Sequence, residues 1–216
     1  MANAIFWSNV GVDVQTALGA AITISAISKA ATAVATYAGS TAPTVGDYIA
    51  VTANGMYQVS DRIFRVANVN TVAKTFELEG EDSTSYDSFA SGSFQVITFG
   101  ASFANLQNIN VSGGEPEFAD VTTIHDNVRK RVPTIVSPLS LSMDAIYDLS
   151  DAGFVECNKA YRAKAKRAIR LRFGTGAKMV LTGYASASGV PTGQAQGVVQ
   201  TKVSIEAQNM PTVYAA

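Results

Sequence analysis

The sequence predicts a mainly β protein with one α-helix. Most of its 216 residues fall into short segments in which apolar and polar residues alternate, separated by clusters rich in Gly, Asn and Asp. Only residues 151–166 place apolar side chains at steps of three and four, the spacing of a helix with one buried face. Charged residues make up 15% of the chain, where about 25% is usual. So little charge is typical either of a surface covered by partner subunits or of a β-rich protein with Ser, Thr and Gly outside, and both interpretations stay open.

The composition excludes several classes of function. The single cysteine, Cys157, rules out an internal disulfide and a cysteine-based metal site, and the single histidine, His125, rules out a histidine cluster. The net charge of -1 offers no general attraction for nucleic acid. The N-terminus lacks the basic stretch and apolar run of a signal peptide, and polar residues interrupt the apolar stretch at residues 17–38, so no membrane span is expected. We therefore expect a soluble protein made inside the cell.

Residues 1–21 begin with an apolar cluster that includes Phe6 and Trp7, and a weakly alternating segment follows at residues 10–14. Chain ends usually fray, so aromatic side chains at this place need a surface to cover them. Two interpretations stay open. The cluster packs on its own domain, or it anchors the arm on a neighbouring subunit, since tryptophan is favoured at the hot spots of interfaces.

Residues 22–98 predict a small β-barrel or sandwich. Short alternating strands follow one another at close intervals. The dipeptide Asn54-Gly55 is a strong signal for a tight turn because both residues tolerate a positive φ. The expected strands cover residues 22–27, 31–37, 47–52, 62–66, 75–79 and 94–97.

Four phrases of this stretch carry a resemblance to a known module. They are Val45-Gly-Asp-Tyr-Ile49, Phe64-Arg-Val-Ala-Asn68, Thr75-Phe-Glu-Leu78 and Ser83-Thr-Ser-Tyr86. Together they resemble a small β-barrel of ubiquitin-activating enzymes that recurs as an accessory piece in phage structural proteins. The resemblance implies a decoration or spacer and no activity of its own.

The rest of the chain predicts further strands and the helix. Residues 100–116 are interpreted as a linker that ends in a Gly-Gly-Glu-Pro reversal. Ser150 is the expected cap of the helix at residues 151–166, whose basic last turn suits the helix dipole. Apolar residues from Phe154 to Ala168 give this helix a single packing stripe. The expected strands cover residues 134–136, 139–143, 169–173, 178–184 and 199–207.

No set of residues suited to catalysis can be assembled. His125 and Cys157 could form a nucleophilic pair, but Cys157 lies on the apolar stripe of the helix, which favours a buried thiol. Gly174-Thr-Gly176 resembles a phosphate-binding loop, but no helix follows it. An acidic patch could bind a hard cation, although its alternation along a strand is more typical of a solvated face. It consists of Glu77, Glu79, Glu81 and Asp82. We expect no enzymatic activity, no cofactor and no metal.

Two basic clusters need an explanation. Seven of the 16 basic residues lie between residues 159 and 172. They form a solvated face, a seam against an acidic neighbouring subunit, or a contact with phosphates. Base stacking needs aromatic residues, and this run holds only Tyr161, so the subunit seam is favoured over nucleic acid. The second cluster, Arg129-Lys-Arg131, is expected to contact carboxylates of the next subunit.

A run near the middle of the chain carries the second resemblance. Glu117-Phe-Ala-Asp-Val-Thr-Thr-Ile-His-Asp-Asn-Val-Arg-Lys-Arg-Val-Pro-Thr134 begins as a strand, breaks into a polar and then basic loop, and resumes as a strand. One helix and then only strands follow. This order and this loop chemistry resemble the tail tube proteins of long-tailed bacteriophages. The resemblance implies a β-sandwich or barrel flanked by one helix, made of residues 1–21 and 99–216. Residues 22–98 would be a small β-barrel inserted on its outer surface.

The resemblance also implies an assembly and its contacts. Rings of six copies stack into a tube, and the long loop at residues 126–133 reaches the adjacent ring. The candidates for contacts between subunits or rings are Phe6, Trp7, Phe118, Asp120, Arg129, Lys130, Arg131, Arg162 and Lys166. The candidates for the channel lining are Gln200, Lys202, Ser204 and Glu206, and on a second strand Ser137, Ser140 and Ser142. A lining of small polar and acidic side chains lets DNA pass without holding it, and Lys202 departs from that pattern.

The implied partners are further copies of the chain, together with tape measure, tail terminator and tail-tip proteins. Double-stranded DNA would pass through the channel without specific contacts, on its way into the host. The implied location is the tail of the virion, after assembly in the host cytoplasm. Two other classes of function stay open. One is another virion component, either a head decoration protein or a tail fibre module. The other is a carbohydrate-binding β module whose sugar platforms would be Tyr37, Tyr48, Tyr57 and Tyr86.

Overall fold

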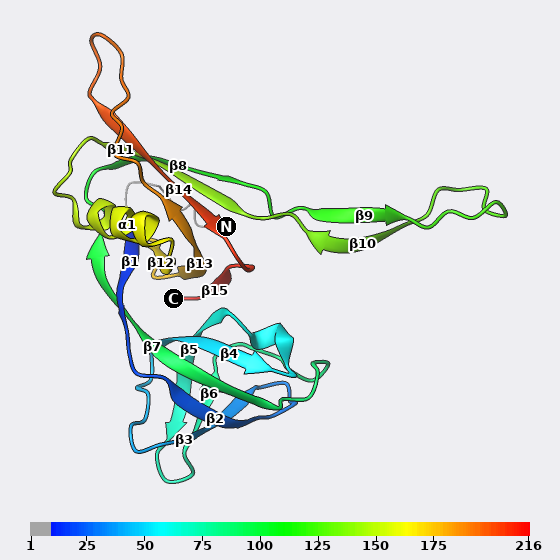
Figure 1. Cartoon of the computed structure of the whole chain (residues 1–216). Helices are drawn as coiled ribbons and strands as arrows, with labels where there is room; N and C mark the ends of the chain where they lie inside the picture. The colour runs from blue at the N-terminus through cyan, green and yellow to red at the C-terminus, as the bar shows by residue number, and fades with distance from the viewer. Residues whose placement is uncertain (1–9) are drawn as a thin grey trace.

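A computed structural model describes residues 10–216 and is mainly β with one α-helix, as predicted (Figure 1). The aromatic cluster with Phe6 and Trp7 lies outside the described residues. The strands are β1 (Gly11–Leu18), β2 (Ile22–Ile27), β3 (Val34–Ala38), β4 (Tyr48–Asn54), β5 (Arg62–Asn70), β6 (Thr75–Leu78), β7 (Ser91–Ser102), β8 (Leu106–Ser112), β9 (Pro116–Asp120), β10 (Arg131–Val136), β11 (Ser140–Ile146), β12 (Lys166–Arg172), β13 (Lys178–Ser186), β14 (Gln200–Ala207) and β15 (Thr212–Tyr214). The α-helix is α1 (Ala152–Ala163), and a short 3-10 helix, η2, covers Tyr57–Val59.

Strands β2 to β7 close into the predicted small barrel. Their order is β2-β3-β6-β5-β4-β7, and β2 also pairs with β7, so each of these strands has a neighbour on both sides. Closure leaves the barrel without open sheet edges. A core of its own fills it, and Phe64, Phe76 and Phe94 are fully buried there. The rings of Phe76 and Phe94 meet edge to face, with their centroids 5.1 Å apart.

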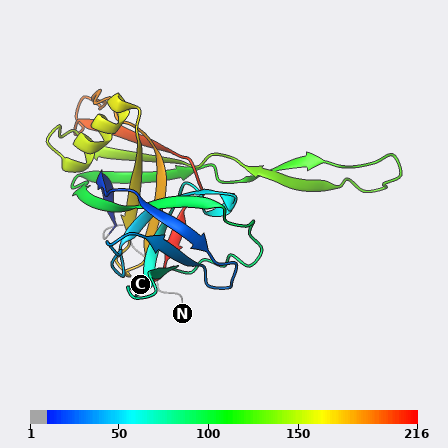
Figure 2. The same cartoon turned by 60° about the horizontal axis from the view of Figure 1, so that its bottom comes forward.

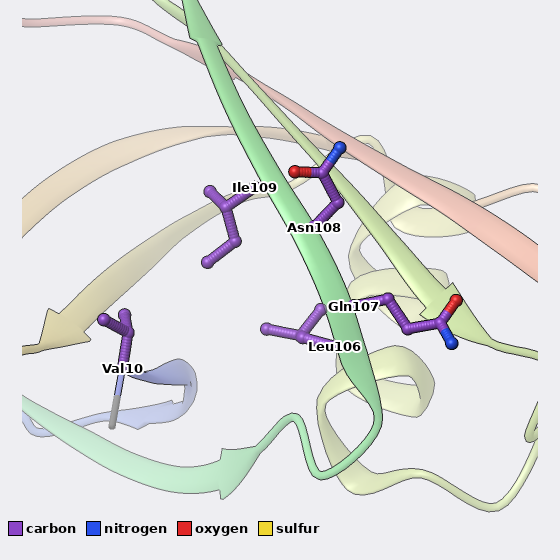
Figure 3. Close-up of a pocket in the computed structure, with 5 residues that line it drawn as sticks. All are labelled: Val10, Leu106, Gln107, Asn108 and Ile109. Atoms are coloured by element: carbon purple, nitrogen blue, oxygen red, sulfur yellow. The ribbon is translucent and has the colours of Figure 1, made fainter. Parts of the chain in front are cut away.

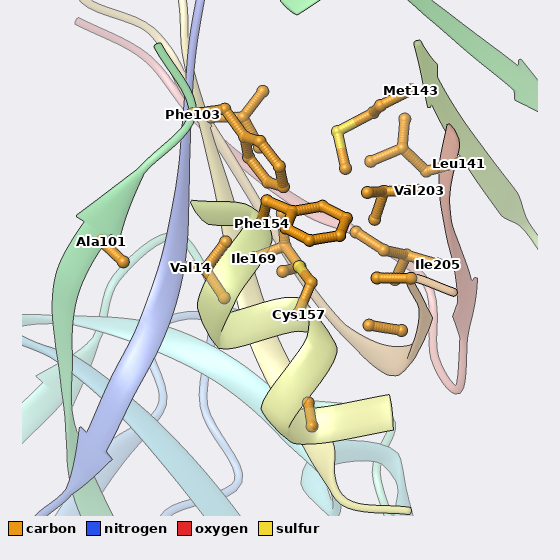
Figure 4. Packing of buried hydrophobic residues seen from close by; sticks show 14 of the residues in the cluster. Val14, Ala101, Phe103, Leu141, Met143, Phe154, Cys157, Ile169, Val203 and Ile205 are labelled. Carbon is orange, nitrogen blue, oxygen red and sulfur yellow. The ribbon is translucent and has the colours of Figure 1, made fainter. Parts of the chain in front are cut away.

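The sheet continues from β7 through β1, β12, β13, β14 and β11 to β8. Helix α1 packs on one face of this part of the sheet, and a second core fills the space between them (Figure 4). Phe154 and Cys157 of the helix reach into this core toward Leu141, Val203 and Ile205 of the sheet (Figure 4). The predicted stripe is therefore buried at Phe154 and Cys157, but Tyr161 is 47% exposed and Ala165 and Ala168 lie beyond the end of the helix.

Helix α1 begins and ends at residues other than those expected. Asp151, and not Ser150, is the N-cap: its Oδ1 accepts a hydrogen bond from the backbone N–H of Phe154 at 3.0 Å. Ser150 instead donates its hydroxyl proton to Asp148. The helix stops at Ala163 because Lys164 takes a left-handed conformation (φ 49°) and closes the last turn. The prediction that the helix reaches Lys166 is wrong, since Lys166 already begins β12.

The predicted linker at residues 100–116 is wrong as well. Strand β7 continues to Ser102, and Leu106–Ser112 form β8, which pairs with β11. A register shift leaves Gln107 without a partner, because Asn108 pairs with Asp144 and Leu106 with Ala145. This bulge places Leu106 and Ile109, three residues apart, on the same side, so the period of two that marks a strand is lost from the sequence.

Candidate assembly surfaces

Strands β9 and β10 form a hairpin arm that projects from the body of the molecule (Figures 1 and 2). They pair antiparallel, with Arg131 opposite Asp120 and Val136 opposite Pro116, and every residue of both strands is exposed. Phe118 is 55% and Ile135 65% exposed. A two-stranded ribbon without a core is at best marginally stable in water. The arm therefore exposes apolar side chains on a ribbon that has no core to stabilise it.

The tip of the arm is a network of charged and hydroxyl groups. Arg129 pairs with Asp120 at 2.7 Å, and Lys130 pairs with Asp126. Hydrogen bonds from the side chain and backbone of Thr122, and then from Arg129, lower the pKa of Asp120 to about 2. Two of the three cations expected to contact the next subunit thus already have a partner in their own arm. Arg131, opposite Asp120 in the ladder, makes no ion pair within residues 10–216.

A polar face covers one side of β8, β11 and β14. Along β14, polar residues from Gln200 to Glu206 alternate with buried core residues, as the sequence predicts. Glu206 accepts a hydrogen bond from the hydroxyl of Ser140 at 2.9 Å, and Lys202 lies opposite Asp144 in the ladder. The positive charge that departs from an acidic lining therefore has a carboxylate beside it. The face consists of Asn108, Asn110, Ser112, Ser140, Ser142, Asp144, Gln200, Lys202, Ser204 and Glu206.

Strand β8 is the last strand on this side of the sheet, since β11 is its only neighbour among the described residues. A shallow pocket of about 200 Å³ lies beside it, between Val10 and residues Leu106 to Ile109. Figure 3 shows Leu106 and Ile109 pointing toward Val10, while Asn108 points away from it. An unpaired strand edge with a pocket beside it is a surface on which a further strand can add.

The basic run at residues 159–172 is mostly paired within the chain. Lys159 pairs with Glu156 at 2.5 Å, and Lys166 lies 3.8 Å from Asp61 of the barrel. Arg170 and Arg172 both bind Asp13, each at 2.7 Å. Arg162, a further candidate for a subunit contact, is exposed and lines a groove of about 290 Å³ beside α1. The run is therefore largely part of the fold, which the spacing of its residues in the sequence does not reveal.

The comparison with protein families gives one match. A family model described as "Phage tail tube protein, TTP" matches residues 54–216. The chain belongs to this family. It is thus a structural component of a bacteriophage tail tube, and this decides against a head decoration or tail fibre module. No curated protein is similar enough to count as a match.

The matched segment of this tail tube protein begins at Asn54, the last residue of β4. It therefore includes β5, β6 and β7 of the barrel as well as the sheet and the arm. Half of the strands of the barrel belong to the segment that the family model describes.

The structure does not bring the groups that could suggest chemistry together into one site. Cys157 is fully buried, and burial raises the pKa of its thiol to about 12. His125 lies in the loop that joins the two strands of the arm, away from the helix that carries Cys157. Glu79 and Glu81 of the acidic patch pair with Arg65 and Arg62 of β5. Within residues 10–216, no group of three or more acidic, His or Cys side chains is placed to hold a metal ion.

The tyrosines proposed as sugar platforms do not form a surface. Tyr37 and Tyr48 are buried in the cores, and the hydroxyl of Tyr86 donates to Glu81. Only Tyr57 is freely exposed, at 70%. One tyrosine is not a binding site for a sugar chain, so the structure contradicts the carbohydrate-binding alternative. Neither α1 nor η2, the helices of the described part of the chain, is long and apolar enough to cross a bilayer.

Proposed function

We propose that this tail tube protein assembles into rings of six copies, which stack into a tube that conducts the phage genome into the host. The observation that carries the proposal is the arm β9–β10. It exposes Phe118 and Ile135 on a ribbon that has no core of its own. An acceptor surface on another copy would stabilise the ribbon and link two subunits or two rings. The tip residues Asp120, Arg129, Lys130 and Arg131, with Arg162 and Lys166 near the helix, are the proposed polar contacts.

The polar face of β8, β11 and β14 is the proposed lining of the channel. Asn and Ser side chains offer DNA only weak, exchangeable hydrogen bonds, and Asp144 and Glu206 repel phosphates. Lys202 is the one cation of the face, and Asp144 beside it reduces its attraction for DNA. In a ring, the free edge of β8 would pair with a strand of the next copy, which would extend the face around the channel.

We further propose that residues 22–98 form a separate unit on the outside of the tube, carried by a domain of residues 1–21 and 99–216. The closed six-strand order and the separate core of β2–β7 support this division. The boundary at residue 98 falls inside β7, which belongs to both the barrel and the sheet. A relationship to the small barrel of ubiquitin-activating enzymes stays part of the proposal.

The proposed partners outside the ring are tape measure, tail terminator and tail-tip proteins, which follow from the family resemblance. Assembly would take place in the host cytoplasm, and the finished tube would be part of the virion tail. The N-terminal segment that contains Phe6 and Trp7 is proposed to contact a neighbouring copy.

Electron cryomicroscopy of the purified, concentrated protein tests this proposal. We expect hollow tubes of stacked rings, with the barrel on the outer wall and β14 facing the channel. Rings with another number of copies would overturn the proposed ring size but not the assembly into a tube. A protein that stays monomeric at every concentration and ionic strength would overturn the assembly.

Replacing Arg129, Lys130 and Arg131 with Ser is expected to weaken stacking and leave folding unchanged. The substitutions remove three positive charges and leave Asp120 and Asp126 without their partners. Exposed ion pairs contribute about 0.2–1 kcal/mol each, so we expect a rise of roughly tenfold in the protein concentration needed for tubes at low salt. The difference should shrink at high salt, where such pairs are screened. Sedimentation of tubes across a salt series measures it, and an unchanged threshold at low salt would remove these residues from the contact.

A further inference from the structure

We infer that the C-terminal strand β15 is a clasp that holds the barrel against the sheet, and that the barrel turns on a two-stranded stalk once the clasp is released. The inference concerns the single subunit and does not depend on how the subunits assemble. It places control of the barrel's orientation in the last few residues of the chain.

The stalk consists of the paired parts of β1 and β7. Within residues 10–216, the chain passes between barrel and sheet only twice, through the β1–β2 connection and through β7 (Figure 1). The two strands pair from Asp13 opposite Ser102 to Leu18 opposite Ile97, with register shifts on both sides of Gln15. Bulges of this kind bend a strand and interrupt its ladder. Two strands with two interruptions do not by themselves fix the direction of the barrel.

Tyr214 is the main contact of the clasp. Strand β15 pairs with β13 of the sheet, with Val213 opposite Met179. From there the side chain of Tyr214 reaches the barrel, where its hydroxyl accepts a hydrogen bond from the backbone N–H of Arg65 at 2.7 Å. The guanidinium of Arg65 lies 4.8 Å from the centre of its ring, and the ring of Tyr48 meets it at 6.0 Å. Tyr214 is only 4% exposed, although it lies near the end of the chain.

The same contact continues into the sheet as an aromatic and cationic stack. Tyr48 meets Phe99 of the stalk edge to face at 5.7 Å. The guanidinium carbon of Arg170 in β12 lies 4.5 Å from the centre of the Phe99 ring and 5.5 Å from the centre of the Tyr48 ring. Asp13 forms an ion pair with the same guanidinium. The stack therefore joins the barrel, the stalk and the sheet, and Tyr214 packs against it through the Tyr48 ring.

Little else holds the two parts together. The buried apolar cluster between them has six members, against seventeen in the core under α1. They are Tyr48, Ile63, Ile97, Ala168, Val180 and Tyr214. At the rim, Asn209 donates to the carbonyl of Asp61, and Lys166 lies 3.8 Å from the Asp61 carboxylate. Exposed pairs of this length contribute little. Loss of Tyr214 would therefore remove a large share of the contact.

The test is amide hydrogen exchange on the unassembled full-length chain, with Tyr214→Ala as the main variant. We expect exchange in the stalk, at residues 15–18 and 97–99, to become roughly tenfold faster or more, because the stalk can then bend. Amides of β6 and β14 should keep their protection, while the amide of Arg65, which loses its acceptor on Tyr214, should exchange faster. Solution scattering should show a longer maximum dimension. Val213→Ala is the matched control, since Val213 lies on the same strand and is 64% exposed. It should change neither measurement.

Unchanged exchange in the stalk of Tyr214→Ala would overturn the inference. If that variant loses protection throughout the chain, Tyr214→Phe decides, because it keeps the ring and removes only the hydroxyl that accepts from Arg65. Faster exchange confined to the stalk and to the amide of Arg65 in Tyr214→Phe would support the clasp. No increase there, or an increase spread over barrel and sheet alike, would overturn it.

Discussion

A chain in which residues 117–135 are replaced by a two-residue Asn-Gly turn is expected to fold and to form no tubes. Pro116 and Val136 lie opposite each other in the ladder, so a short turn can join them without strain. None of the excised residues belongs to a buried core. The melting temperature should therefore stay within a few degrees of the parent. Tube formation should fall at least roughly a hundredfold, because the arm supplies the exposed apolar surface.

The double variant Phe118→Ser, Ile135→Ser tests whether assembly needs the apolar side chains of the arm or only the hairpin itself. It keeps the hairpin and should reduce assembly nearly as much as the excision. Thr134→Ser, at an exposed position next to Ile135, is the matched control and should assemble as the parent does. Electron microscopy and sedimentation report assembly, and thermal unfolding reports the fold. Normal tubes from the chain without its arm would exclude the arm from the contacts that build the tube.

Asp13→Asn is expected to cause a large loss of stability. The Asp13 carboxylate is buried and accepts hydrogen bonds from Arg170, Arg172 and Ser102 at 2.7–2.9 Å. Removing one member of a buried ion pair typically costs about 3–5 kcal/mol. Arg172 is about half exposed and regains hydration, so we expect roughly 3 kcal/mol. Urea unfolding of the unassembled subunit measures this loss.

The same substitution makes a prediction about pH. Burial raises the pKa of Asp13, but hydrogen bonds from Arg172, Ser102 and Arg170 outweigh it and hold the pKa below its ordinary value of 3.8. A carboxylate with a lowered pKa in the folded state stabilises the fold above its unfolded pKa, and this contribution is lost as the pH falls through the folded pKa. The stability gap between the parent and Asp13→Asn should therefore be constant above about pH 5 and narrow below about pH 4.

Asp126→Asn is the matched control for Asp13→Asn. Asp126 also pairs with a cation, Lys130, but it does so at the exposed tip of the arm. Its replacement should change the free energy of unfolding far less than Asp13→Asn does. A stability gap for Asp13→Asn that stays the same at pH 3 would show that the carboxylate acts through its shape and not through its charge.

Local patterns in the sequence were sufficient for most of the fold. Strands β6 and β14 follow from alternation, because their inward residues are buried and their outward residues are not. Strands β4 and β5 also bury the outward residues Tyr48 and Ile63 against the sheet. The stripe predicted from Phe154 to Ala168 marked the buried face of α1 at Phe154 and Cys157 but not at Tyr161, which is exposed. Strand β8 was missed because its bulge at Gln107 breaks the period of two. The helix cap was misplaced by one residue, since Ser150 and Asp151 are both good caps and only the local turn chooses between them.

Some features of the candidate surfaces could likewise be predicted from the sequence, and others could not. The polar face of β14 was predictable, because one face of a half-buried strand must be polar. The internal pairing of the basic run was not, since Asp13 is separated from Arg170 and Arg172 by most of the chain. A run of charges looks the same in a sequence whether its partners are water, another subunit or a distant carboxylate. The roles of the tip residues and of the channel lining stay predictions.

The sequence by itself determined the class of the fold, the small barrel, the single helix with its buried face and the family to which the chain belongs. These features rest on residues close to one another along the chain, where spacing alone separates buried from exposed positions. Only the tertiary structure decided which cations are already paired, that the arm stands free of any core, and that Tyr214 joins the end of the chain to the barrel. Such contacts link residues far apart in sequence. They arise when the sheet and the barrel are brought together, and no local pattern encodes them.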